Sequence, residues 1–184
     1  MLGVCRIFTG VSGSPGSVHA LRQAAALARH HAVPLIPLLA WLPPGGSANE
    51  RKDPCPEVRQ LWEDQAWQRL WKALDTAFGG LPTGIATQPV VVRGKPGRAL
   101  TLLARQPGDL VVIGAGRRGP LWRLGGCGVA GYCLAHACCP VLAVPPSALA
   151  REAGYGLRGW AARHRWIRDA AQPAWPVTPR PAVG

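Results

Sequence analysis

Acidic residues are scarce in this chain. Only nine of its 184 residues are Asp or Glu, whereas 21 are Lys or Arg, so the formal net charge is +12. Lysine is scarce too, because 18 of the 21 basic residues are arginine. An excess of base favours anionic partners such as nucleotides, nucleic acid or acidic lipid. Alanine, glycine and proline are also abundant, so we attribute the overall excess to biased composition and look for anion sites in local clusters.

The six cysteines contain no C-x-x-C pair. They stand at positions 5, 55, 127, 133, 138 and 139. This spacing argues against a zinc ribbon and against a thioredoxin-type redox motif. We find no signal peptide before the first apolar segment, so a secreted disulfide framework is not expected. We expect reduced thiols and a cytoplasmic protein.

One charge-poor segment is long enough to span a bilayer. Residues 124–150 contain no Asp, Glu, Lys or Arg. Four glycines near the start of the segment and three prolines further on argue against a continuous helix, and Pro140 would break a spanning helix beyond its middle. A short helix followed by a short strand explains the same residues, and a membrane span is the minor alternative.

Apolar segments alternate with helical patterns through the first 146 residues. We expect strands at residues 4–11, 35–41, 87–92, 109–114 and 139–144, and helices at residues 15–31, 57–78, 96–106 and 127–137. The alternation implies right-handed crossovers and an α/β, doubly wound, five-stranded parallel sheet with helices on both faces. Pro37 conflicts with the second strand and is tolerable there only at a bulge or a sheet edge.

The composition changes after Pro146, so we expect one domain over residues 1–146 and a basic tail over residues 147–184. The tail holds six arginines, two acidic residues and, within residues 173–184, four prolines. Trp160, His164 and Ile167 would share one face of a short basic helix, and the proline-rich end is expected to be disordered. Nucleic acid or a membrane surface is a conceivable partner of the tail, but a solvated extension is the favoured interpretation.

The segment with the clearest chemical meaning follows the fourth expected strand. The apolar run at residues 109–114 opens into a loop rich in glycine and arginine, and a helix made of small residues comes next. Glycines let backbone N–H groups approach an anion, and the start of a helix adds partial positive charge. The segment from Gly114 to Ala130 is therefore predicted to line a phosphate cradle at the carboxyl ends of the strands, near the turn at Ser12.

Three segments resemble the universal stress protein family. The first, FTGVSGSP at residues 8–15, precedes an alanine-rich helix and is followed by LAW at residues 39–41. The second pairs VRGKPG at residues 92–97 with GDLVVIG at residues 108–114, and the third pairs GVA at residues 128–130 with HACCPVLAV at residues 136–144. The resemblance covers residues 1–146. It implies an adenine-nucleotide alpha hydrolase-like, Rossmann-like fold and a non-catalytic stress-response domain.

Many members of that family bind ATP through the motif G-x-x-G, nine residues, then G and Ser or Thr. Aligned without gaps, Gly114 takes the first position, but Arg117, Cys127 and Gly128 take the other three. The family's aspartate in the first loop, which reads the adenine or ribose side, is Ser12 here. Loss of the hydroxyl at position 128 would weaken phosphate binding by about 0.5–1.5 kcal/mol.

The arginines of the loop supply a different way to bind phosphate. The guanidinium of Arg117, together with Arg118 and Arg123, can pair with phosphate directly. Whether the loop holds ATP or no ligand is left open by the sequence. The candidate nucleotide-binding residues are Ser12, Trp41, Ile113, Gly114, Gly116, Arg117, Cys127, Gly128, Val129 and Ala130.

No nucleophile stands beside a general base in these loops, so we expect a protein that is not an enzyme and holds no metal. The alternative is an ATP-using enzyme of the pyrophosphatase-loop class, whose loop reads S-G-G-x-D-S. Residues 12–17 (SGSPGS) match three of its five fixed positions, and the central aspartate is missing.

The last expected strand suggests a partner chain. Val141–Val144 is short and apolar, and it is expected at a sheet edge, where unpaired backbone groups invite pairing. Family members commonly dimerise through this strand, so the resemblance implies a homodimer.

Overall fold

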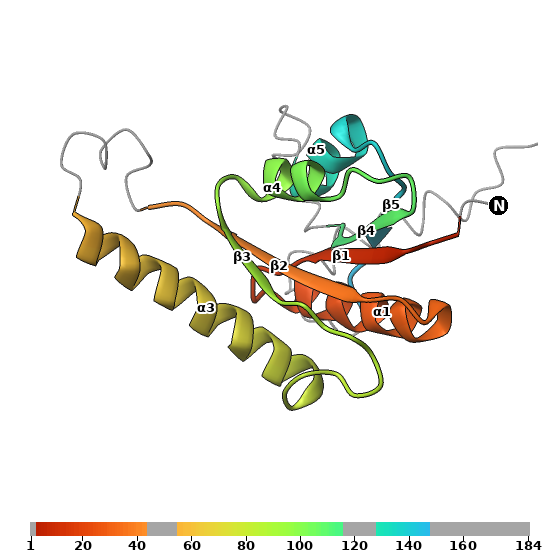
Figure 1. Ribbon diagram of the computed structural model, residues 1–184, viewed down its shortest axis with the longest axis horizontal. Helices are drawn as coiled ribbons and strands as arrows, with labels where there is room; N and C mark the ends of the chain where they lie inside the picture. The colour runs from red at the N-terminus through yellow and green to blue at the C-terminus, as the bar shows by residue number, and fades with distance from the viewer. Residues whose placement is uncertain (1–2, 44–54, 116–127, 148–184) are drawn as a thin grey trace, which may run out of the picture. The chain divides into compact units, whose positions relative to one another are not determined.

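The computed structural model describes residues 3–43, 55–115 and 128–147. All of them belong to the first of the two compact units of the chain, Met1–Ser147. The expected tail, with Trp160, His164 and Ile167, lies outside the described residues. In the first unit, five parallel strands form one sheet in the order β3-β2-β1-β4-β5 (Figure 1).

The predicted doubly wound parallel sheet is confirmed. Strands and helices alternate along the chain as follows: β1 (Arg6–Gly10), α1 (Pro15–His31), β2 (Leu35–Trp41), α3 (Pro56–Phe78), β3 (Val90–Arg93), α4 (Pro96–Leu103), β4 (Asp109–Gly114), α5 (Val129–His136) and β5 (Val141–Val144). The strand order reverses between β1 and β4, which are hydrogen-bonded neighbours. In open α/β sheets, a reversal of this kind leaves a crevice at the carboxyl ends of the strands.

The helices cover both faces of the sheet. Helices α1 and α3 lie on one face, and α4 and α5 lie on the other (Figure 1). Alternation along each strand divides the core accordingly: Ile7 packs with the α1 and α3 residues, whereas its neighbour Phe8 packs with those of α4 and α5. Both side chains are almost fully buried. The strands are therefore mostly apolar, as expected for a sheet covered on both sides.

The cap of α1 matches the sequence pattern. Ser14 is the N-cap, its side chain accepts a hydrogen bond from the Ser17 N–H at 3.3 Å, and Pro15 occupies the first turn. Alanines at every third or fourth position bury the face of the helix that contacts the sheet. The expected span of residues 15–31 is confirmed.

Several other helices and strands begin or end at residues that differ from the expected ones. Helix α4 stops at Leu103 instead of residue 106, because Ala104 leaves the helical conformation and the Gln106 N–H donates to the Asp109 carboxylate at 2.9 Å. Strand β3 begins at Val90 instead of residue 87, and Thr87 forms only an isolated bridge. Helix α5 and strands β1 and β5 are each shorter than expected by one to three residues.

The expectation for Pro37 was wrong. Strand β2 lies inside the sheet between β1 and β3, and Pro37 pairs with Thr9. The Leu35 N–H donates to Ala86 O on the β3 side, so the backbone of Pro37, two residues on, faces the same side. The regular β2–β3 pairing starts only at Leu38, beyond this point. The proline therefore removes one hydrogen bond where the ladder is already interrupted.

The charge-poor segment does not form a spanning helix in its described part. Residues 128–147 contain the short helix α5 and the short strand β5. Across the described ranges, no helix combines the length and the apolar character that crossing a membrane requires.

An ion pair joins the neighbouring strands β1 and β4 at their amino ends. The Arg6 Nε and Nη2 groups donate to the two carboxylate oxygens of Asp109 at 2.8 and 2.9 Å. The Asp109 side chain is fully buried, whereas that of Arg6 is 32% exposed and lies 5.2 Å above the Phe8 ring. The hydrogen bonds that Arg6 donates to Asp109 raise the pKa of Arg6 above its ordinary value.

Candidate functional site

The carboxyl end of β4 packs directly on the start of α1. A methyl group added to Gly114 would lie 2.9 Å from Gly16 O and 3.1 Å from the Gly16 carbonyl carbon. Only a glycine allows the two backbones to approach this closely. The structure therefore brings the end of the fourth strand to the first loop, which is the arrangement that the sequence predicts.

Serine hydroxyls organise the first loop. The Ser12 N–H donates to Ser17 Oγ at 3.2 Å, and the Ser14 N–H donates to Ser12 Oγ at 3.4 Å. Ser12 Oγ also lies 3.0 Å from Ser14 Oγ. Ser12 thus shapes the turn by local hydrogen bonding. The first turn of α1 has no acidic residue, so the loop carries neutral hydroxyls and no negative charge at this end of the helix.

The start of α5 supplies a further set of backbone donors. Gly128 is the N-cap and has no side chain that could cap the helix. The first hydrogen bond of the helix is donated by the Tyr132 N–H to Gly128 O at 3.0 Å. The N–H groups of Val129 and Ala130 precede that bond and have no partner within the helix. No acidic residue stands in this first turn. The helix therefore directs partial positive charge toward the carboxyl edge.

A basic groove runs beside this helix start. Its volume is about 820 Å³. It is lined by the residue after β2, by the end of β3 and the turn that follows it, and by α4 and α5, namely Leu42, Val92, Arg93, Gly94, Lys95, Pro96, Gly97, Arg98, Ala99, Leu102, Val129 and Tyr132. These lining residues include three cations and no carboxylate. We refer to this site as the basic groove.

Close packing between α4 and α5 shapes the basic groove. A methyl group added to Gly97 would lie 2.7 Å from Tyr132 Cδ1, so glycine lets the tyrosine ring rest against the first turn of α4. Tyr132 in turn stacks on His136, with ring centroids 4.2 Å apart. The first hydrogen bond within α4 runs from the Ala99 N–H to Lys95 O. The N–H groups of Gly97 and Arg98 precede it and have no acceptor within the helix.

Sequence reasoning missed the basic groove as a site. The segment VRGKPG contributed only to the family resemblance, although residues 93–98 place three bases around a Gly-Pro turn. That clustering was the available signal. Its meaning depends on the fold, because only the packing of α4 on α5 brings these bases next to Val129.

The described candidate residues do not all face one cavity. Val129 lines the basic groove, and Ala130 packs partly into the core under α5. Ile113 is only 2% exposed, and its side chain is in the same core, so it can offer a ligand little besides its backbone. Trp41 is 5% exposed and points to the opposite face, where it lines a separate pocket with residues of α3.

The centre of the glycine- and arginine-rich loop is not covered by the structure. Gly116, Arg117 and Cys127 lie outside the described residues, as do Arg118 and Arg123. Their roles remain predictions from the sequence.

Within residues 3–43, 55–115 and 128–147, no group of three or more His, Cys, Asp or Glu side chains could hold a metal ion. Cys133 and Cys139 are buried free thiols in the α4 and α5 core, and burial raises the pKa of each. A thiol with a raised pKa is a poor nucleophile at neutral pH.

The fold defines an α/β protein with a Rossmann-like parallel sheet, and a groove rich in basic side chains lies at the carboxyl end of β3. Comparison with known families then identifies the class more closely. The chain belongs to the universal stress protein family, whose family model matches residues 5–145. The resemblance predicted from the sequence is confirmed.

Solved structures support the fold. A universal stress protein in complex with cAMP is 24% identical, has a TM-score of 0.52, and aligns over 79% of this chain and 99% of that chain. The universal stress protein UspA from Lactobacillus plantarum is 20% identical, with a TM-score of 0.56 and coverage of 77% and 97%. A hypothetical protein whose biochemical function was assigned from its structure is 18% identical, with a TM-score of 0.61 and coverage of 79% and 98%. A comparison with curated proteins gave no match.

Proposed function

We propose that this domain binds an adenine nucleotide, ATP being the first candidate, at the carboxyl edge of its sheet without catalysing a reaction on it. The observation that carries the proposal is the basic groove, where three cationic side chains and no carboxylate adjoin the start of α5. Phosphate groups are the ligand chemistry that suits this combination of cations and helix-terminal N–H groups.

The rest of the edge supports the same ligand. The start of α1, just after the Ser12 loop, packs against the end of β4 at Gly114, so a nucleoside bound beside this junction could extend its phosphates toward α5. One similar solved structure is a universal stress protein in complex with cAMP. With Ser12 in place of the family's aspartate, phosphate contacts carry a larger share of the affinity than nucleoside contacts. We also propose that the protein acts in the cytoplasm.

Removing two charges from the basic groove should weaken nucleotide binding. We expect the double variant Lys95→Gln/Arg98→Gln to bind ATP at least about tenfold more weakly by isothermal titration calorimetry, because each hydrogen bond to a charged group contributes about 1.5–3 kcal/mol. Both side chains are exposed, so the fold should be retained, and the thermal unfolding midpoint checks this.

The matched control is Arg69→Gln/Lys72→Gln, which removes two charges from the separate pocket at Trp41. It should leave the affinity for ATP unchanged. Equal affinity of the wild-type protein and the Lys95→Gln/Arg98→Gln variant would contradict a phosphate site in the groove. Pyrophosphate released from ATP by the purified wild-type protein would instead favour the pyrophosphatase-loop alternative.

We further propose a homodimer formed through β5. Among the described residues, this strand pairs with β4 alone and ends the sheet, and its Leu142 side chain is 41% exposed. An edge strand with an exposed apolar side chain favours pairing with a second copy. We expect light scattering to give a dimer mass for the wild-type protein and a monomer mass for Leu142→Lys. The control Leu134→Lys, which alters an exposed leucine of α5, should stay dimeric. A monomeric wild-type protein at micromolar concentration would overturn this proposal.

A further inference from the structure

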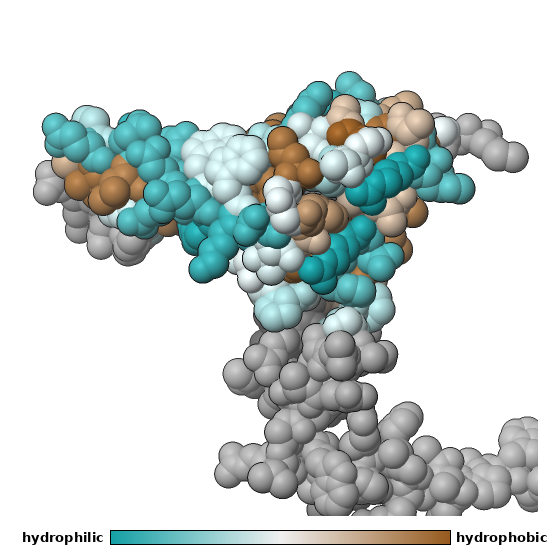
Figure 2. Space-filling model, turned by 90° about the horizontal axis from the view of Figure 1, so that it is seen from below, coloured by the Kyte–Doolittle hydropathy of each residue, from teal (hydrophilic) through white to brown (hydrophobic). Residues whose placement is uncertain are grey.

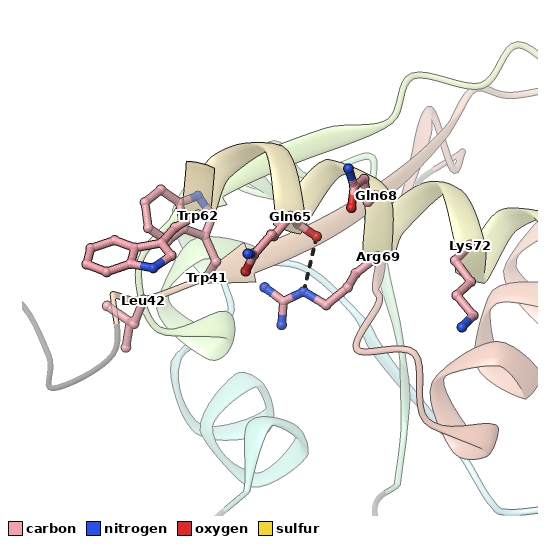
Figure 3. Close-up of a pocket in the computed structure, with 7 residues that line it drawn as sticks. All are labelled: Trp41, Leu42, Trp62, Gln65, Gln68, Arg69 and Lys72. Carbon is pink, nitrogen blue, oxygen red and sulfur yellow. Dashed lines mark hydrogen bonds between the residues drawn. The ribbon is translucent and has the colours of Figure 1, made fainter. Parts of the chain in front are cut away.

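A second pocket lies on the face of the sheet that carries α1 and α3. Its volume is about 440 Å³, within the range of small-molecule sites. It is lined by Trp41 and Leu42 at the end of β2 and by Trp62, Gln65, Gln68, Arg69 and Lys72 of α3 (Figure 3). We call it the tryptophan pocket. In the described part of the chain, Leu42 is the one residue that it shares with the basic groove.

Two indole rings form the apolar end of the tryptophan pocket. Trp41 is 5% exposed and is held by the core between β2 and α3, and the half-buried Trp62 packs on the same core. Figure 3 shows both rings gathered at one end of the pocket. Because surrounding side chains fix the rings, the pocket offers a flat apolar surface that needs little ordering when a ligand binds.

Polar side chains of α3 form the rest of the wall. Gln65, Gln68, Arg69 and Lys72 are separated by three, one and three residues, so they lie on one stripe of the helix. The Arg69 Nε donates to Gln65 O at 3.4 Å, which draws the guanidinium back along the helix toward the indoles (Figure 3). Lys72 lies further along the same stripe.

Within residues 3–43, 55–115 and 128–147, no salt bridge joins either cation of this stripe to a carboxylate. The salt bridge that the described residues do form joins Arg6 to Asp109, at the amino end of β4. Asp64, on α3 itself, accepts a hydrogen bond from Gln60 at 3.3 Å and does not line the pocket. Viewed from the side of α1 and α3, the surface is mostly hydrophilic with small apolar patches (Figure 2).

We propose that the tryptophan pocket is a second ligand site, independent of the nucleotide site, that takes a small planar aromatic anion. The ring of the ligand stacks on the half-buried Trp62, with the nearly buried Trp41 at the floor of the pocket, and its carboxylate or other anionic group pairs with Arg69 and Lys72. The amides of Gln65 and Gln68 donate to or accept from polar atoms on the edge of the ring. Stacking selects planar rings, and the positive charges of Arg69 and Lys72 select anions over neutral analogues.

Three probes separate the contribution of ring stacking from the contribution of the negative charge. We expect 2-naphthoate to bind the full-length protein in isothermal titration calorimetry. Neutral 2-naphthamide and non-planar cyclohexanecarboxylate should each bind at least about tenfold more weakly. In ¹H–¹⁵N spectra, 2-naphthoate should shift the indole N–H signals of Trp41 and Trp62, assigned by conservative Trp→Phe variants.

Variants test the same assignment. Trp62→Ala should weaken 2-naphthoate binding by about tenfold or more, and Trp62→Leu is the milder change if the alanine variant unfolds. Arg69→Gln/Lys72→Gln should abolish the preference for 2-naphthoate over 2-naphthamide. The control Lys95→Gln/Arg98→Gln, which weakens ATP binding under the nucleotide proposal, should bind 2-naphthoate as the wild type does.

Two results would overturn the inference. One is the absence of heat and of shifts at Trp41 and Trp62 with millimolar 2-naphthoate. The other is 2-naphthoate binding that Lys95→Gln/Arg98→Gln weakens and Arg69→Gln/Lys72→Gln does not, since the probe would then occupy the basic groove. Failure of ATP to bind would affect only the nucleotide proposal, because the tryptophan pocket is probed with a different ligand.

Discussion

Asp109→Ala is expected to lower the free energy of unfolding by about 3–5 kcal/mol, because it removes one partner of a buried ion pair. The fully buried Asp109 carboxylate accepts two hydrogen bonds from Arg6 and one from the Gln106 N–H. These contacts join β1 to β4 and fix the turn that ends α4. The alanine variant leaves the Gln106 N–H without its acceptor and the partly buried guanidinium without its counter-ion.

Urea denaturation followed by circular dichroism measures this loss. Asp109→Asn keeps the size of the side chain and one acceptor oxygen, so its loss should be smaller than that of the alanine variant. Arg6→Ala removes the partly exposed partner and should also cost less. Combined in a double-mutant cycle, Arg6→Ala and Asp109→Ala should be clearly non-additive. A loss below about 1 kcal/mol for Asp109→Ala would mean that the pair behaves like an exposed surface salt bridge.

The fold was predictable because local pattern and global topology agree. The apolar run Leu35–Trp41 and the three- and four-residue spacing along Pro56–Phe78 each indicate one kind of element, and both elements form as expected. The end of α4 was not predictable, because it depends on a carboxylate that Arg6 positions from another strand. Pro37 is tolerated for a similar reason, since its missing donor faces an interruption in the pairing with β3 that the sequence alone does not show.

The candidate site was predictable only in part. The neighbourhood of Gly114 and the first loop follows from any parallel sheet in which β1 and β4 are adjacent, and the structure shows it. Trp41 shows which part of the site the sequence did not predict. Its position at the end of β2 was recognised, but the face to which its side chain points depends on strand alternation and on which helix covers that face. The basic groove likewise exists only after α4 packs on α5.

The second large effect concerns the core that supports this groove. Leu100 of α4 is fully buried, and Leu100→Ala should lower the free energy of unfolding by about 2–5 kcal/mol through lost burial and a residual cavity. The exposed Leu102 on the same helix gives the control, and Leu102→Ala should change stability by no more than about 0.5 kcal/mol.

Combining Leu100→Ala with Gly10→Ala tests whether β1 packs on α4 at these two residues. A methyl group added to Gly10 would lie 3.1 Å from Leu100 Cδ1 and 3.5 Å from Ile113 Cγ2, so Gly10→Ala alone should destabilise the protein by crowding the core. In the Leu100→Ala background the crowding atom is gone. The same methyl group then fills part of the cavity and should restore about 0.8 kcal/mol. Urea denaturation of the four proteins in the cycle should therefore show Gly10→Ala changing sign between backgrounds, whereas additive effects would mean that β1 and α4 do not meet as described.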